Sequence, residues 1–165
     1  MSIDNPSRLI AIEDSLKNTN PTPAIINALV NAHNTLGLAA VDSHNFIKGI
    51  SHFKKAISLS QNDTLSIYHL NMAEGHILKK TGKKEKIWEA IQKYYKAGTM
   101  KPKLGEPYYY IGESYYKLDD KEFDLILDSY DLALSLDLDD SLRKKIVAIR
   151  DDTIRREKRL KQFWR

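Results

Sequence analysis

The stretch "YYYIGESYYKLDDKEFDLILDSYDLA", residues 108 to 133, decides the fold class of this 165-residue chain. Its apolar and aromatic residues recur every three or four positions on both sides of a polar break at Asp119-Asp120. Residues three and four apart share one face of an α-helix, so this spacing is typical of two amphipathic helices joined by a short turn. The stretch therefore predicts one helix pair.

The second helix of that pair carries an aromatic and small-residue ladder that occurs three times in the chain. Its intervals are three, four and three residues each time: Phe46, Gly49, Phe53 and Ala56; Ile87, Ala90, Tyr94 and Ala97; Phe123, Ile126, Tyr130 and Ala133. A glycine lies upstream of each ladder in the preceding helix: Gly37, Gly75 and Gly112. A small residue lets two helices approach closely, and an aromatic ring fills the space beside it. The chain therefore contains a helix-pair repeat of about 40 residues.

Apolar residues keep helical spacing almost throughout, and strand-like alternation is missing, so the fold class is all-α. Asn5-Pro6 and Thr22-Pro23 each combine a capping residue with a proline in the first helical turn. Together with the polar breaks they predict eight helices, at about residues 6–18, 23–41, 45–59, 64–80, 84–98, 106–118, 121–136 and 140–163.

The repeat resembles the tetratricopeptide family, whose first helix has the pattern W-x2-L-G-x2-Y. Here Tyr108-x2-Ile111-Gly112-x2-Tyr115 matches it, whereas His33 replaces the tryptophan of the first unit and the second unit aligns on either Ala73 or Gly75. The resemblance implies a right-handed α-solenoid of three helix pairs with a capping helix at each end. The expected boundaries are 1–22 for the N-terminal cap, 23–62, 63–103 and 104–139 for the repeats, and 140–165 for the basic C-terminal capping helix.

Charge is distributed in blocks. Residues 64–103 carry nine basic and three acidic groups, residues 104–140 two and eleven, and residues 141–165 ten and three. Blocks of this kind give a folded chain faces of opposite sign, which steer a charged partner or favour contact between copies, although many are simply solvated helix faces.

Catalytic and metal chemistry has little support in the sequence. Cysteine is absent, and no two of the five histidines have the one-turn spacing of a helical metal site. We expect no metal, no cofactor and no enzymatic activity. No run approaches the roughly 18 uninterrupted apolar residues of a membrane span, so we also expect a soluble, cytoplasmic protein without one.

The tetratricopeptide resemblance implies a protein-interaction module, an adaptor, scaffold or assembly factor that binds a partner's peptide or helix in a concave groove. The first helices of the pairs would line this groove. Carried over by position, the groove residues are Asn31, Asn34, Leu38, Tyr109, Tyr110, Glu113 and Tyr116. The groove residues that come from the third helix pair are acidic and aromatic, so we expect the partner segment to be basic or amphipathic.

The basic tail leaves other interpretations open. Its candidate residues are Arg155, Arg156, Arg159, Lys161, Phe163 and Trp164. Cations beside aromatic rings suit nucleic acid, with the lysine-rich turn at residues 79–86 as a second contact. The tail could equally dock on a second copy and make a homo-oligomer, lie on an anionic membrane, or be a solvated capping helix.

Overall fold

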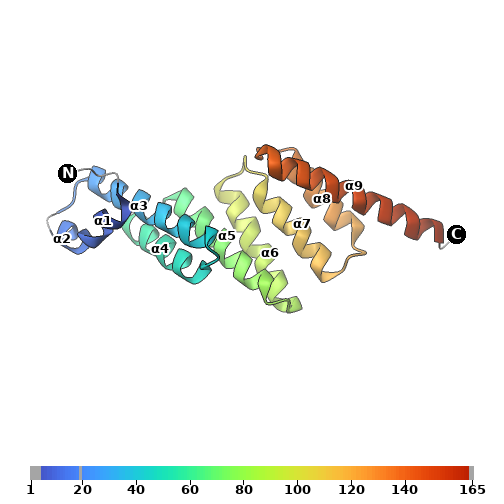
Figure 1. Ribbon diagram of the computed structural model, residues 1–165, viewed down its shortest axis with the longest axis horizontal. Coiled ribbons are helices and arrows are strands. Elements are labelled where there is room, and N and C mark those ends of the chain that lie inside the picture. The colour runs from blue at the N-terminus through green and yellow to red at the C-terminus, as the bar shows by residue number, and fades with distance from the viewer. Residues whose placement is uncertain (1–4, 19, 164–165) are drawn as a thin grey trace. The chain divides into compact units, whose positions relative to one another are not determined.

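The computed structural model describes residues 5–18 and 20–163, which form helices and turns without a strand (Figure 1). In chain order the helices are α1 (Pro6–Ala11), α2 (Glu13–Lys17), α3 (Pro23–Asp42), α4 (Phe46–Leu59), α5 (Thr64–Lys80), α6 (Lys84–Met100), α7 (Glu106–Leu118), α8 (Phe123–Leu134) and α9 (Asp140–Phe163). The chain divides into two compact units, Met1–Glu74 and Gly75–Arg165, so α5 contributes its first part to unit 1 and its last part to unit 2. The all-α prediction is confirmed.

The helices of unit 1 begin where the sequence places capping residues. The side chains of Asn5 and Thr22 accept hydrogen bonds from backbone N–H groups three residues on, at 3.2 and 3.4 Å, and Asn45 does the same at the start of α4 at 3.2 Å. The single helix expected at residues 6–18 is wrong, because the helix breaks at Ile12. Beyond the break, Glu13 is turned inward and buried.

Helix α3 is the only one in the described part of the chain with the length and apolar composition of a membrane span. This is weak evidence, since the core helix of a folded domain passes the same test. Helix α3 packs against α1 and α4, and it buries the polar side chains of His33 and Asn34 as well as apolar ones.

Each helix pair is held together by the predicted contact between a glycine and an aromatic ring. A Cβ atom added to Gly37 would lie 2.4 Å from Cε1 of Phe53, which is closer than any real carbon contact. The same construction gives 2.5 Å between Gly75 and Tyr94, and 2.5 Å between Gly112 and Tyr130. Because Gly75 makes this contact, the second repeat aligns on Gly75 rather than on Ala73. Any larger residue would push the paired helices apart.

One core cluster of unit 2 joins α7, α8 and α9. Tyr109, Ile126, Tyr130, Ala133 and Ile146 form it. One face of α9 is apolar, because Leu142 and Ile149 pack on this core beside Ile146. Arg143 also donates hydrogen bonds to the backbone carbonyls of Leu134 and Leu136, at 2.8 and 2.9 Å, where α8 ends. Helix α9 therefore covers a face of α7 and α8 that would otherwise be exposed.

Candidate functional site

Helix α7 divides its tyrosines between packing and surface. Tyr109 is only 1% exposed, because α9 covers it and Lys145 Nζ lies 5.0 Å from its ring centroid. Its hydroxyl donates a hydrogen bond to Glu113, one turn further along α7. The placement of Tyr109 on an exposed groove face is therefore wrong: this ring is part of the core of unit 2.

Tyr110 stands in an aromatic stack and is half-buried. Its ring is stacked on Tyr94 at a centroid distance of 5.4 Å, meets the edge of His76 at 4.5 Å, and lies 4.6 Å from Lys79 Nζ. Burial, followed by the nearby carboxylates of Glu106 and Glu113, raises the pKa of Tyr110 to about 12. The stack therefore presents a neutral phenol at physiological pH.

Glu113 is a paired carboxylate rather than a free acidic group. Lys79 Nζ lies 2.6 Å from its Oε2 atom, and Tyr109 donates to its other oxygen. Burial raises the pKa of this carboxyl, but the hydrogen bonds from Lys79 and Tyr109 outweigh that effect and the pKa is lowered. Glu113 is thus ionised and already neutralised within unit 2.

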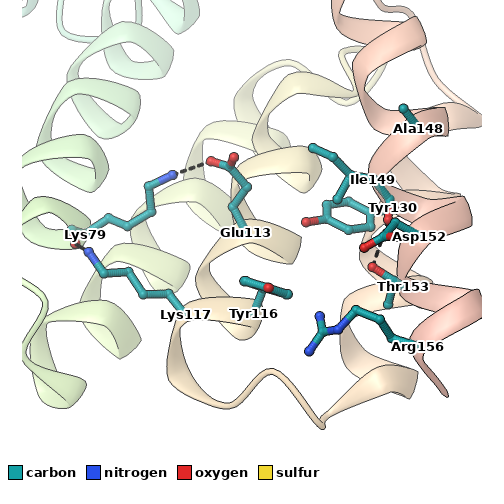
Figure 2. Close-up of a pocket in the computed structure, with 10 residues that line it drawn as sticks. All are labelled: Lys79, Glu113, Tyr116, Lys117, Tyr130, Ala148, Ile149, Asp152, Thr153 and Arg156. Atoms are coloured by element: carbon teal, nitrogen blue, oxygen red, sulfur yellow. Dashed lines mark hydrogen bonds and ion pairs between the residues drawn. The ribbon is translucent and has the colours of Figure 1, made fainter. Parts of the chain in front are cut away.

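A hollow of about 750 Å³ opens beside α7, between the end of α5, α8 and α9 (Figure 2). Tyr116, at 43% exposure, presents its ring there, and the Arg156 guanidinium lies 5.1 Å from the ring centroid. Figure 2 shows Lys79 and Glu113 facing each other in this hollow, with Lys117 beside them. The residues that line it are Lys79, Glu113, Tyr116, Lys117, Tyr130, Ala148, Ile149, Asp152, Thr153 and Arg156.

The charges around this hollow differ from the acidic surface expected for the third helix pair. Three cations line it, namely Lys79, Lys117 and Arg156, against the two carboxylates Glu113 and Asp152. Lys117 donates to the backbone carbonyl of Lys79 at 2.9 Å and pairs with no carboxylate among the described residues. The hollow is therefore aromatic with a mixed, slightly basic rim.

The expected groove residues of unit 1 are also divided between surface and interior. Asn31 and Leu38 are exposed, in line with a surface role. Asn34 is buried: its amide accepts a hydrogen bond from Ser66 Oγ at 2.9 Å and donates one to Asp63 at 3.5 Å. The prediction that Asn34 faces a partner is wrong, because it bridges α3 to the start of α5.

Three of the four candidate cations of the basic tail are paired within unit 2. Arg155 lies 3.4 Å from Asp152, Arg156 pairs with Asp120, and Lys161 pairs with Glu157. Arg159 is exposed, and so is Phe163, at 83%. Trp164 lies outside the described residues.

The lysine-rich turn at residues 79–86 has paired cations too. Lys79 is held by Glu113, and Lys86 lies 2.8 Å from Glu89. A nucleic-acid surface needs several cations aimed at solvent, and this pairing reduces their number.

Unit 1 contains a polar chain that the sequence did not indicate. His33 Nε2 lies 3.2 Å from the carboxylate of Glu13, and its Nδ1 atom lies 3.0 Å from Nδ1 of His52. The three residues come from α2, α3 and α4, 19 and 20 positions apart, so no local motif connects them. The one available signal was His33 itself, a polar residue at a core position of the repeat. Across residues 5–18 and 20–163, no three histidine, aspartate or glutamate side chains could hold a metal ion.

Comparisons with known proteins define the fold. No family model and no curated protein matches the sequence. Among solved structures, the chain is similar to MamA, residues 41 to the end, from Desulfovibrio magneticus RS-1, a tetratricopeptide-containing protein. The two share 13% sequence identity over 96% of each chain, with a TM-score of 0.51. Together with the all-helical structure, this similarity gives the chain a tetratricopeptide-like helical-repeat fold.

Proposed function

We propose that this protein is a non-enzymatic protein-interaction module, an adaptor, scaffold or assembly factor of the cytoplasm. It binds an amphipathic peptide or helix of a partner protein in the hollow beside α7 of unit 2. The observation that carries the proposal is the exposed ring of Tyr116 in a hollow of about 750 Å³. Tyrosine and arginine side chains in such positions are the commonest anchors of protein interfaces.

The shape and charge of the hollow support an amphipathic rather than a purely basic segment. Ile149 and Tyr130 offer apolar contact area next to Tyr116, so an apolar side chain of the partner would be received there. Polar groups of the partner would meet Lys117, Arg156 and Asp152 at the rim. Glu113 takes no part in attracting cations, because Lys79 already neutralises it.

An architectural proposal accompanies the functional one. We infer a right-handed solenoid of three repeats, with residues 1–22 and 140–165 as the capping segments. The three glycine–aromatic contacts and the similarity to MamA support it. A small-angle scattering profile of the full chain, fitted against stacked and collapsed arrangements, tests it.

The functional test compares two equally exposed residues of unit 2. Tyr116→Ala removes the ring from the hollow, whereas Val147→Ala changes a side chain of the same 43% exposure on α9 that does not line it. Each tagged variant is purified from its native cells, and the associated proteins are identified by mass spectrometry. A fragment of each associated protein is then titrated against the purified wild type and variants. We expect Tyr116→Ala to weaken binding about tenfold or more and Val147→Ala to leave it unchanged. Identical partners and affinities for wild type and Tyr116→Ala would remove the hollow as the binding site.

A further inference from the structure

Helix α6 carries an exposed aromatic surface outside the hollow. Trp88 and Tyr95 are 50% and 46% exposed and lie seven residues apart, so they share one face of the helix about two turns apart. Lys84 and Lys96 are exposed as well and flank the two rings, since Lys84 lies one turn before Trp88 and Lys96 directly follows Tyr95. We name these four residues the aromatic stripe.

The two rings of the aromatic stripe are held in place by tyrosines of α7. Trp88 meets Tyr115 edge to face at a centroid distance of 5.9 Å, and Tyr95 meets Tyr108 in the same way at 6.4 Å. Rings fixed before binding lose little conformational freedom when a partner arrives. Large exposed aromatic side chains in this state are typical of protein interfaces.

Helix α8 presents a surface of the opposite charge with the same spacing. Leu125 and Leu132 are exposed and also lie seven residues apart. Asp124 and Asp128 are exposed on the same side of the helix. We name these four residues the leucine stripe. Helix α8 contains three aspartates and no basic residue, whereas α6 contains four lysines and two glutamates.

The charged groups of both stripes form no ion pair within the described part of the molecule, although Lys161 of α9 acts electrostatically on Asp124. No carboxylate forms an ion pair with Lys84 or Lys96 there, and no cation forms one with Asp124 or Asp128. The C-terminal helix differs in this respect, because Arg155, Arg156 and Lys161 are already paired. Cations available for a second molecule are thus found on α6, and the tail adds the exposed Lys158 and Arg159.

We propose that the aromatic stripe of one molecule docks on the leucine stripe of a second copy of this chain. The two apolar pairs have the same two-turn spacing, so Trp88 and Tyr95 can pack on Leu125 and Leu132 of the other copy. Opposite charges then meet across the contact, and this attraction speeds association. The proposal is independent of partner binding in the hollow, since no residue of either stripe lines it.

Charge reversal and charge exchange in the full-length protein test the proposal. Variant A carries Lys84→Glu with Lys96→Glu, variant B carries Asp124→Lys with Asp128→Lys, and variant C carries all four changes. The control is Lys158→Glu, an exposed lysine of α9 outside both stripes. The mass in solution is measured by light scattering and sedimentation over a range of concentrations, and circular dichroism confirms that each variant is folded.

We expect wild type and the Lys158→Glu control to self-associate, and variants A and B to associate about tenfold more weakly. Variant C should recover the wild-type dissociation constant, because the exchanged charges again attract each other. Raising the salt from about 0.05 to about 0.5 M should weaken the wild-type complex. At a protein concentration of about 100 µM, a contact with a dissociation constant of about 1 µM is almost saturated. A wild-type protein that stays monomeric at that concentration overturns the proposal. Association that survives in variants A and B, or that is lost only when residues 154–165 are deleted, assigns the contact to another surface and also overturns it.

Discussion

The contact between Gly112 and Tyr130 leads to a prediction about stability. The substitution Gly112→Ala should lower the free energy of unfolding when the Tyr130 ring is present, but not when the ring is removed. In Gly112→Ala the new Cβ atom would lie 2.5 Å from Cε1 and 2.7 Å from Cδ1 of Tyr130, whereas carbon atoms normally approach to about 3.5 Å. The ring would have to move by about 1 Å in a core where Tyr130 is fully buried. Overpacking of this kind costs about 1–3 kcal/mol, while alanine gains about 1 kcal/mol over glycine inside a helix. We expect Gly112→Ala to destabilise unit 2 by up to about 2 kcal/mol.

The same substitution should behave differently once the ring is removed. Tyr130→Leu alone leaves space beside Gly112 and lowers stability by about 2–4 kcal/mol. In that background alanine keeps its helical advantage without the clash, apart from a tight 3.2 Å approach to Cβ of Ser129. The effect of Gly112→Ala should then be neutral or stabilising by up to about 1 kcal/mol. The two substitutions are thus coupled by about 2 kcal/mol.

Urea unfolding of the wild type, both single variants and the double variant measures this coupling. Trp88 lies on α6 of unit 2 and packs against Tyr115 of α7, so its fluorescence reports the unfolding of that unit. Far-ultraviolet circular dichroism reports both units together. Equal effects of Gly112→Ala in the presence and absence of the Tyr130 ring would refute the view that close packing of this pair excludes larger residues.

Three further predictions concern buried polar groups. Burial, followed by the charge of Lys79, lowers the pKa of His76 from 6.5 to about 4, so the neutral form is favoured in the folded state and stability falls as the pH drops from about 6.5 towards 4. The loss of folding stability reaches about 3 kcal/mol, and the variant His76→Gln should not show this pH dependence. An NMR titration in which His76 has a midpoint near pH 6.5 argues against its burial. Glu13→Gln should destabilise unit 1 by about 1–3 kcal/mol, because the buried carboxylate accepts from His33; faster hydrogen exchange in α1 to α3 checks it, and unchanged exchange contradicts it. Asn34→Ala should lower the free energy of unfolding by about 1–3 kcal/mol, whereas Asn31→Ala, at an exposed position nearby, should change it by no more than about 0.5 kcal/mol. Equal unfolding midpoints for the two variants count against the bridge from Asn34 to α5.

Local patterns predicted the helices well, because the information that specifies them is local. Caps such as Thr22 and the three-four-three ladders lie within single helices, and seven of the eight predicted helices appear within about two residues of their expected ends. The exception at Ile12 arises where Glu13 turns inward towards His33, a residue 20 positions away. A partner so distant in sequence leaves no periodic signal.

The candidate site was less predictable because it depends on which helix covers which. Tyr109 and Tyr116 look alike in the sequence, yet α9 covers Tyr109 and leaves Tyr116 exposed. Asn34 was assigned to the groove by its position in the repeat, but Ser66 and Asp63 satisfy its amide in the interior. Glu113 was taken as a source of negative charge, and Lys79, 34 residues away, neutralises it.

Glu13 fixes the direction of donation in the hydrogen bonds that link Glu13, His33 and His52. The pKa of Glu13 is lowered, since the hydrogen bonds from Lys17 and His33 outweigh the effect of burial, so the carboxylate is ionised and can only accept. His33 must therefore carry its proton on Nε2, which leaves its Nδ1 as an acceptor for the Nδ1–H of His52. Of the two imidazoles, only Nε2 of His52 is then left with a lone pair outside this series of hydrogen bonds. His52 also lines a small cavity in unit 1, so the basic end of the series is the end beside that cavity.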